Sequence, residues 1–383
     1  MAHGTEPDDD EPSGDPGLDD GDGGLTLPHH DEGVAVEDRL PGVDYGERAH
    51  LHPDGSPRIV DRHLTVEPEV AGLRLDHFIK LKIPRMSRTR IQAVIGRNLL
   101  RASGKPFRAN TSVAVGDVFT IRRAARPEPP SPRTFGVVYR DDALFIIDKP
   151  SGLSMHSSAK FYFNTLTRVL DEAFPDGPPQ ICHRIDRETS GILVAAWGSV
   201  AGAAVKGAFA NRLVKKTYLA IVEGDPPWPD EASGAEHVLD IPLRVAALGD
   251  PTKLLGVRMM PGPGGMPSVT RVCVRQRTGR YALVRCTPVT GRQHQIRAHL
   301  AHVGHPIIGD KLYRHGDDVF MAACDGRLDA AGRAALVLSR HALHAASIDL
   351  PHPTRPGRIA VEAPLPPDMQ RLLLPAAPGS PAA

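Results

Sequence analysis

Cysteine is scarce in this chain of 383 residues, which contains four cysteines and no Cys-x-x-Cys pair. This spacing argues against a disulfide framework and against a zinc site built from thiolates, because both use cysteines that come together in pairs or fours. We therefore expect reduced thiols, most of them buried. The four cysteines are Cys182, Cys273, Cys286 and Cys324.

Long apolar runs and phosphate-binding glycine motifs are also missing. No window approaches eighteen consecutive apolar residues, and the N-terminus is acidic rather than basic followed by an apolar stretch. We expect neither a membrane span nor a signal peptide, and the predicted location is the cytoplasm. The absence of Gly-x-Gly-x-x-Gly and of a Walker loop gives a dinucleotide-binding fold or a nucleotide hydrolase little support.

Basic residues are absent from the first 38 positions, which hold 13 Asp or Glu. Residues 39–383 therefore carry all 46 Lys and Arg against 32 acids, although the formal net charge of the chain is +1. Such an excess suits a polyanion such as structured RNA, and the alternative is a solvated basic surface. Residues 1–60 combine acid runs with Gly and Pro, which predicts a disordered tail that aids solubility.

The positive charge concentrates in a short module at 61–123. Its residues 72–123 contain twelve Lys or Arg against two acids. The stretches GLRLDHFIKLKI and SRTRIQAVIGRNLL have helical periodicity, with Ser87 as a helix cap, and VAVGDVFTIRR alternates like a strand. A small N-terminal α/β domain of this kind would present basic side chains to RNA phosphates. The candidate RNA-binding residues are Lys80, Lys82, Arg85, Arg88, Arg90 and Arg97.

Residues 124–134 are rich in proline and predict a semi-rigid linker at a domain boundary. The body that follows, 135–374, alternates strand-like runs with helical stretches. We expect an α+β domain with a mixed, largely antiparallel β-sheet flanked by helices. Residues 375–383 are expected to form a disordered tail. No long heptad seam indicates an obligate partner, so we expect a monomer.

The segment ICHRIDRETSGILVAAW at 181–197 has a polar interruption between two apolar strands, with Asp186 inside it. Arg184 and Arg187 flank this aspartate, and nearby positive charge favours the ionised carboxylate. An ionised carboxylate suits a nucleophile or a general base. An aspartate in a turn between strands is more commonly a structural cap, so this segment alone leaves both interpretations open.

The segment TPVTGRQHQIRAHLAHVGHPIIGDKLY at 287–313 predicts a strand end, a turn and a helix. Its apolar stripe leaves Arg297 at the margin of the buried face, where a guanidinium can reach a carboxylate such as Asp186. Four histidines in this stretch suggest a metal site, but no Glu or Asp stands at ligand spacing, and we expect no metal. We expect surface or RNA-facing positions for His294, His299, His302 and His305.

The segment KKTYLAIVEG at 215–224 predicts a strand on which Tyr218 alternates with Ala220 and Val222. A tyrosine in such a strand is usually a core residue with a satisfied hydroxyl. A phenol can also stack on a flipped base and exchange a proton with it. The strand by itself does not decide between these roles.

Together these stretches resemble one family, the RluA-type RNA pseudouridine synthases, whose catalytic domain carries a His-Arg-Leu-Asp-x-x-Thr-Ser-Gly motif. This chain reads HRIDRETSG at 183–191, with Ile185 in place of the usual leucine. The resemblance extends through DKPSGLSMH, KKTYLAIVEG, GRQHQIRAHLAHVGHPIIGDKLY and ALHAASIDLPHP over nearly all of 135–353. The module at 61–123 resembles an RNA-binding module of ribosomal proteins and tyrosyl-tRNA synthetases, which precedes the catalytic domain in many members of the family.

The resemblance implies an isomerase that converts specific uridines of ribosomal or transfer RNA to pseudouridine without a cofactor. It implies that Asp186 is the catalytic aspartate, that Tyr218 packs on the target uracil and that Arg297 pairs with Asp186. It also implies that Arg184 enters the space vacated by the flipped nucleotide. Which RNA is modified stays open, as does the choice between attack of Asp186 on C1′ and removal of the C2′ proton.

Two other classes of function are alternatives. A catalytically silent RNA-binding assembly protein would keep the fold, but the intact Asp186, Tyr218 and Arg297 count against it. A glycoside hydrolase or nucleosidase would use a pair of cooperating carboxylates. The neighbourhood of Asp186 offers Glu188 alone for this role, and we expect Glu188 on an exposed turn beside Arg187.

Overall fold

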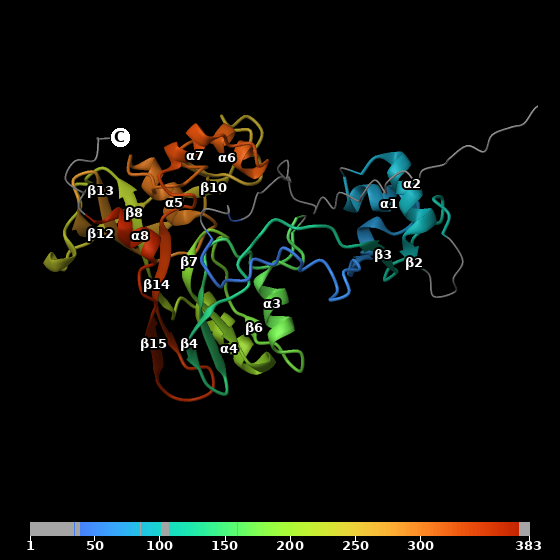
Figure 1. The fold of residues 1–383 in the computed structure, drawn as a ribbon, viewed down its shortest axis with the longest axis horizontal. Coiled ribbons are helices and arrows are strands. Elements are labelled where there is room, and N and C mark those ends of the chain that lie inside the picture. The colour runs from blue at the N-terminus through green and yellow to red at the C-terminus, as the bar shows by residue number, and fades with distance from the viewer. Residues whose placement is uncertain (1–33, 35–38, 85, 101–106, 159, 375–383) are drawn as a thin grey trace, which may run out of the picture. The chain divides into compact units, whose positions relative to one another are not determined.

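The structure of the protein is a computed structural model. It describes residues 34, 39–84, 86–100, 107–158 and 160–374. Within this described chain there are two compact units (Figure 1). The smaller unit comprises residues 58–125, and the larger unit comprises residues 39–57 and 126–374 together with Val34.

In the described residues of the smaller unit, two helices pack against a three-stranded antiparallel sheet of order β1-β3-β2. The hydroxyl of Ser87 accepts a hydrogen bond from the amide of Arg90 and so caps the second helix, as predicted. Phe78 and Phe119 meet in the core that the helices and the sheet share. In chain order the elements are β1 (Ile59–Thr65), a 3-10 turn (Pro68–Val70), α1 (Leu75–Lys82), α2 (Arg88–Arg97), β2 (Leu99–Leu100) and β3 (Val118–Ala124).

The larger unit is built on one long sheet. Its described strands run in the order β4-β5-β7-β14-β8-β13-β12-β9, with β6 paired to β7 and β15 to β14. Among these strands only β7 and β14 pair in parallel. The predicted α+β class with a mixed, largely antiparallel sheet is confirmed. The strands are β4 (Gly136–Arg140), β5 (Leu144–Lys149), β6 (Gln180–Ile181), β7 (Ser190–Ala196), β8 (Lys215–Glu223), β9 (His237–Asp240), β12 (Val269–Arg277), β13 (Tyr281–Pro288), β14 (Leu343–Pro351) and β15 (Arg358–Glu362), and a separate pair is β10 (Leu243–Val245) and β11 (Met259–Pro261).

Helices cover the sheet, so that its central strands are buried on both faces. Alternate residues of β5 join different hydrophobic clusters, Phe145 one cluster and Leu144 the other. Figure 1 shows α4 beside β6 and β7, whereas α5 lies near β11. No helix in the described ranges combines the length and the apolar character needed to cross a membrane. The helices are α3 (Leu166–Ala173), α4 (Gly198–Ala210), a 3-10 turn (Glu231–Ser233), α5 (Gln295–His302), α6 (Asp317–Cys324), α7 (Ala330–Leu336) and α8 (Pro367–Leu372).

The segment 39–60 differs from the prediction that it belongs to a disordered tail. Tyr45 is buried, and its carbonyl accepts a hydrogen bond from the amide of Ser131. The side-chain amide of Asn164 donates to the carbonyl of Gly46. Burial of an aromatic ring and pairing of the backbone offset the entropy of ordering here, which acid-rich composition alone did not reveal.

The linker 124–134 is also more ordered than predicted. Ser131 is fully buried, and its hydroxyl donates to the carbonyl of Gly152 at 2.9 Å. The carboxylate of Glu128 accepts hydrogen bonds from the backbone amides of Phe163 and Asn164. The linker thus docks along the larger unit through polar contacts that its proline content does not indicate. Residues 1–33 and 35–38 of the predicted N-terminal tail, the predicted tail at 375–383 and the candidate Arg85 lie outside the described residues.

Gly191 marks the point where β7 and β14 come closest. It pairs with Ala345 in the parallel ladder and has a φ of 106°. A Cβ atom at this position would lie 2.2 Å from the carbonyl oxygen of Ala345. Only glycine fits this approach, so the glycine that ends the HRIDRETSG motif brings the preceding loop against β14.

Candidate active site

The loop between β6 and β7 carries Asp186 and is held by hydrogen bonds at its far end. The amide of Thr189 donates to the carbonyl of Asp186 at 3.1 Å, which closes a tight turn. The hydroxyl of Thr189 lies 2.8 Å from Nε2 of His341, and that of Ser190 lies 3.0 Å from Nδ1 of His344. These buried contacts with the start of β14 fix the direction of the turn and therefore of the aspartate.

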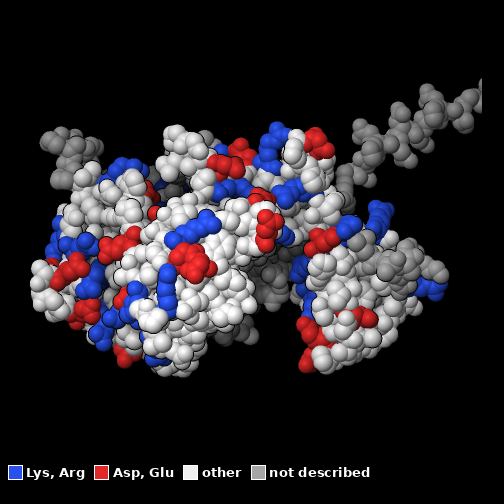
Figure 2. Space-filling view, turned by 90° about the horizontal axis from the view of Figure 1, so that it is seen from below, with Lys and Arg blue, Asp and Glu red and all other residues white. Residues whose placement is uncertain are grey.

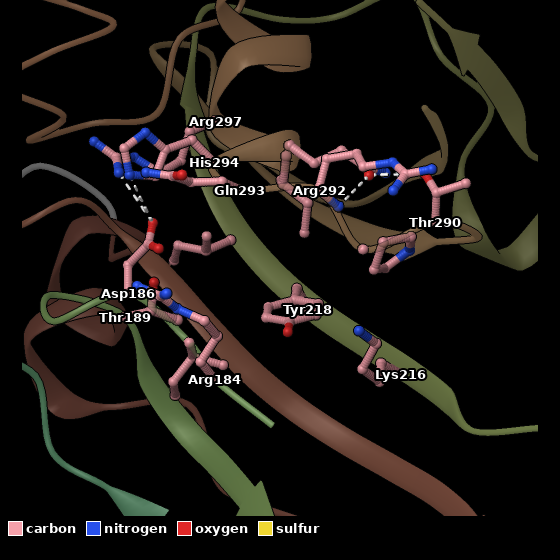
Figure 3. Close-up of a pocket in the computed structure, with 16 residues that line it drawn as sticks. Arg184, Asp186, Thr189, Lys216, Tyr218, Thr290, Arg292, Gln293, His294 and Arg297 are labelled. Atoms are coloured by element: carbon pink, nitrogen blue, oxygen red, sulfur yellow. Dashed lines mark hydrogen bonds and ion pairs between the residues drawn. The ribbon is translucent and has the colours of Figure 1, made fainter. Parts of the chain in front are cut away.

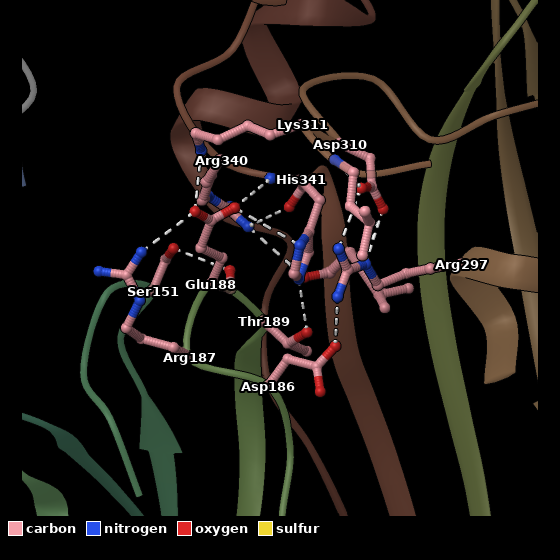
Figure 4. Close-up of polar contacts among 12 residues, drawn as sticks. Ser151, Asp186, Arg187, Glu188, Thr189, Arg297, Asp310, Lys311, Arg340 and His341 are labelled. Carbon is pink, nitrogen blue, oxygen red and sulfur yellow. Dashed lines mark hydrogen bonds and ion pairs between the residues drawn. The ribbon is translucent and has the colours of Figure 1, made fainter. Parts of the chain in front are cut away.

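Arg297, from α5, joins two carboxylates. Its Nη1 donates to Oδ2 of Asp186 at 3.0 Å, which is the contact predicted from the sequence. Its Nε and Nη2 donate to both oxygens of Asp310, at 2.6 and 3.0 Å. Asp310 also accepts the amides of Leu312 and Tyr313. The bidentate partner of the guanidinium is thus Asp310. This pair directs the third guanidinium nitrogen, Nη1, at Asp186 (Figure 4).

Asp186 is held as a carboxylate anion. Its side chain is 27% exposed. Burial opposes ionisation, but His294 and Arg297 lower the pKa of Asp186 by more, so that it falls below its usual range. Burial lowers the pKa of His294 itself to about 4, so its ring is neutral at neutral pH. The permanent charge that stabilises the anion therefore comes from Arg297.

A cavity of about 180 Å³ opens beside Asp186. Among the described residues that line it, Asp186 is the sole carboxylate. Figure 3 shows Tyr218, from β8, in the middle of this cavity, with Arg184 to one side and Lys216 further along the strand. Burial and the charge of Asp186 raise the pKa of Tyr218 above its usual range, so the phenol keeps its proton. The described lining thus combines one carboxylate anion and one neutral phenol with four cationic side chains, those of Arg184, Lys216, Arg292 and Arg297.

Glu188 differs from the prediction that it lies on an exposed turn. Its side chain is 18% exposed, and Oε1 accepts a hydrogen bond from Nζ of Lys311 at 2.8 Å. Oε2 accepts the backbone amide of His341 (Figure 4). Glu188 does not line the cavity of Asp186. The arrangement does not provide the two facing carboxylates that a glycosidase would use.

Lys149, at the end of β5, holds the loop that carries Asp186. It is fully buried, and its Nζ donates to the carbonyls of Pro150, Leu153 and Arg187. Burial lowers the pKa of Lys149 to about 7. Since Arg187 follows Asp186 directly, this ammonium ties the loop after β5 to the loop that carries the aspartate.

The histidines of the α5 region are not all at the surface, so part of that prediction was wrong. His294 lines the cavity, with Nε2 at 3.9 Å from Oδ2 of Asp186. His299 is fully buried, and its ring nitrogens lie 3.0 Å from the Thr270 hydroxyl and 2.9 Å from the Ile241 carbonyl. His302 is exposed and His305 is half-buried. Helical periodicity did not capture this pattern because α5 is wedged between β11, β12 and β13.

Sequence reasoning missed Asp310, His294 and Lys216 as parts of the site. Asp310 had a usable signal, because a buried arginine on an apolar stripe requires a buried acid. His294 has a φ of 50° at the start of α5, a backbone conformation that turns the chain and that periodicity does not show. Lys216 was missed because a lysine that follows another lysine is usually exposed to solvent.

Comparisons with known proteins identify the family of the chain. The family described as RNA pseudouridylate synthase matches residues 143–302, which contain Asp186, Tyr218 and Arg297.

Curated relatives extend the match over most of the chain. Ribosomal large subunit pseudouridine synthase C of Vibrio cholerae is 30% identical over 328 residues, which cover 81% of this chain and 95% of the relative. Ribosomal large subunit pseudouridine synthase D of Neisseria meningitidis is 31% identical over 325 residues, with 81% and 80% covered. The solved structure of Human RNA Pseudouridylate Synthase Domain Containing 4 is 27% identical, with 61% of this chain and 90% of that chain covered and a TM-score of 0.46. The family match and the two curated relatives show that the chain belongs to the RluA-type RNA pseudouridine synthase family. The protein is therefore an isomerase that converts uridine to pseudouridine in RNA.

Proposed function

We propose that this enzyme isomerises uridines of large-subunit ribosomal RNA and that Asp186 is its catalytic aspartate. The substrate follows from the names of its relatives, which are ribosomal large subunit pseudouridine synthases. One observation carries the assignment of Asp186. Among the described residues that line the cavity it is the sole carboxylate, and its one close cationic partner orients it toward that cavity.

The reaction needs no co-reactant, because its atoms balance within the nucleotide. The N1–C1′ bond of uridine breaks, the uracil turns, and a C5–C1′ bond forms. The proton on C5 leaves, and N1 gains one. Ionised Asp186 can take part in two ways, by attack on C1′ or by removal of the C2′ proton, and both begin from the carboxylate anion that the site maintains.

We propose roles for three other residues. Tyr218 packs on the flipped uracil and, as a neutral phenol in the cavity, is a candidate to exchange the C5 proton. Arg297 positions Asp186. Arg184, exposed at the rim of the cavity, fills the space that the flipped nucleotide leaves in the RNA. Enclosure of the free uracil by these walls keeps water from C1′ and so prevents hydrolysis.

The smaller unit contributes RNA binding through its helices. Lys80, Arg88 and Arg97 are exposed there, while Lys82 pairs with Glu67 and Arg90 is half-buried. In Figure 2 the visible face of the larger unit carries Lys and Arg interspersed with Asp and Glu. The exposed Lys80, Arg88 and Arg97 of the smaller unit are the candidates to contact RNA phosphates.

The test is tritium release from RNA transcribed with C5-tritiated uridine. We expect release from large-subunit ribosomal RNA by the wild-type enzyme, none by Asp186→Ala, and equal binding of that RNA by both. Small-subunit ribosomal RNA and transfer RNA are the comparison substrates. Release from transfer RNA alone would overturn the substrate, and equal release by Asp186→Ala would overturn the catalytic assignment.

A further inference from the structure

Lys216 is a cation of the cavity to which none of the steps above gives a role. It lies on β8 two residues before Tyr218, so both side chains leave the same face of the strand. Both line the cavity. Figure 3 shows Tyr218 between Asp186 and Lys216, which puts the lysine at the end of the cavity away from the aspartate.

The surroundings of Lys216 favour an anion that the protein does not supply. Asp186, the one carboxylate among the described residues that line the cavity, pairs with Arg297 rather than with Lys216. The ammonium group of Lys216 lies 5.7 Å from the centroid of the Phe209 ring. Burial lowers the pKa of Lys216, which shows that the charge is partly removed from water. A Cβ atom on Gly291 would lie 3.8 Å from Nζ, so the Thr-Gly turn leaves room beside the ammonium group.

The position along β8 indicates which part of the substrate lies there. The strand is exposed at Lys215, half-buried at Lys216 and buried from Tyr218 to Val222. Lys216 therefore stands toward the solvent end of the cavity, where the RNA chain must enter and leave while the base is held against Tyr218. The group of a nucleotide that is both anionic and at this end is a backbone phosphate.

We propose that Lys216 binds a phosphodiester oxygen of the RNA backbone next to the flipped uridine and so positions the nucleotide against Asp186. This inference rests on the proposed function of the cavity. Lys216 is a positioning residue here, since it contacts the RNA backbone and not the reacting atoms. The aliphatic part of its side chain stays against Phe209 whether or not the charge is present.

The test compares Lys216→Met with Lys215→Met. Both variants remove one positive charge from neighbouring positions of β8, but the exposed Lys215 leaves the opposite face of the strand. Tritium release is measured against RNA concentration at several salt concentrations. For Lys216→Met we expect KM to rise about tenfold, as for loss of a charged hydrogen bond, and the slope of log KM against log salt to fall by about 0.7–1. Lys215→Met should leave both KM and the slope of log KM against log salt close to their wild-type values.

Two further measurements separate binding from structure. Lys216→Arg should restore KM and the salt slope, because it keeps the charge. A neutral methylphosphonate linkage beside the target uridine should raise KM for the wild type and should add nothing to the effect of Lys216→Met. Thermal unfolding of each variant checks the fold, and Lys216→Gln replaces Lys216→Met if the latter is unfolded.

The outcomes distinguish this inference from the function on which it rests. A fall in kcat with an unchanged salt slope would mean that Lys216 acts on the base, and an unchanged KM would mean that it does not touch the RNA; either overturns the proposal. Absence of tritium release by the wild type on every RNA would instead count against the proposed function.

Discussion

One ion pair from each unit of this protein shows how burial changes what a charge does. In the smaller unit Arg122 and Asp61 form an ion pair at the surface, with side chains that are 50% and 29% exposed. In the larger unit Arg297 and Asp310 form a pair that is 7% and 0% exposed. An exposed ion pair is screened by water and contributes little to stability, whereas a buried and multiply bonded pair holds one geometry.

Loss of Arg297 should have the largest effect. Arg297→Met leaves Asp310 as a buried anion without its partner, so we expect the larger unit to lose about 3–5 kcal/mol of free energy of unfolding. We also expect activity to fall to background, because Asp186 loses its positioning contact. Urea unfolding and tritium release measure the two effects.

A matched exposed pair provides the control for this variant. Arg122→Met, in the smaller unit, should cost much less stability than Arg297→Met. Adding Asp310→Asn to Arg297→Met should recover part of the stability, since an amide still accepts the bonds from Leu312 and Tyr313, but it should not recover activity. Equal losses for Arg122→Met and Arg297→Met would contradict the contrast between the units.

Acid should begin to destabilise the larger unit at a pH above the range in which carboxylates are protonated. Burial lowers the pKa of four of its histidines to about 3 or 4, so they stay neutral when folded and take up protons when unfolded. Stability from these groups is complete above their unfolded pKa of about 6.5 and is lost as pH falls toward the folded values. These residues are His183, His294, His341 and His344.

Tryptophan fluorescence can follow this loss in the larger unit by itself. Both tryptophans of the chain, Trp197 and Trp228, lie there. We expect the free energy of unfolding from urea titrations to decrease steadily between pH 6.5 and pH 5. In the smaller unit His63 and His77 are exposed, so amide hydrogen exchange should show no matching loss. A flat fluorescence result over this pH range would argue against buried neutral histidines.

A smaller effect is expected at the helix cap of the smaller unit. Ser87→Ala removes the hydroxyl that accepts the amide of Arg90, and should cost about 1 kcal/mol of local stability. Hydrogen exchange of the α2 amides measures it, with Thr89→Ala in the exposed first turn as the control. The kcat for saturating RNA should not change, and a matching loss of kcat would mean that the site depends on this helix.

Removal of exposed cations from α2 should have the smallest effect, because it should change RNA binding and leave catalysis unchanged. Arg88→Gln combined with Arg97→Gln should weaken RNA binding and lower its salt slope by about 1 for each residue, with kcat unchanged. Filter binding at several salt concentrations tests this. Unaltered affinity and slope would show that these arginines do not contact RNA, and the function of the basic module would then have to lie elsewhere.

Several parts of the site could be predicted from the sequence because they lie in continuous motifs. The HRIDRETSG stretch gave Asp186 its place between two strands, and the apolar stripe of α5 put Arg297 within reach of it. Asp310 could not be placed in the same way, because the helix and turn that separate it from Arg297 bend the chain back by tertiary packing. The exposed position expected for Glu188 failed for a similar reason, since Lys311 and His341 come from distant segments.

Local patterns of the chain by themselves determined its strands, its capped helix and its family, because each depends on residues that are near in sequence. The tertiary structure decided which charges are buried together. The order of residues 39–60, the pairing of Arg297 with Asp310, the burial of His299 and the isolation of Lys216 all depend on contacts between segments far apart in the chain. Burial and long-range pairing set the energies of those charges, and neither is written in local sequence.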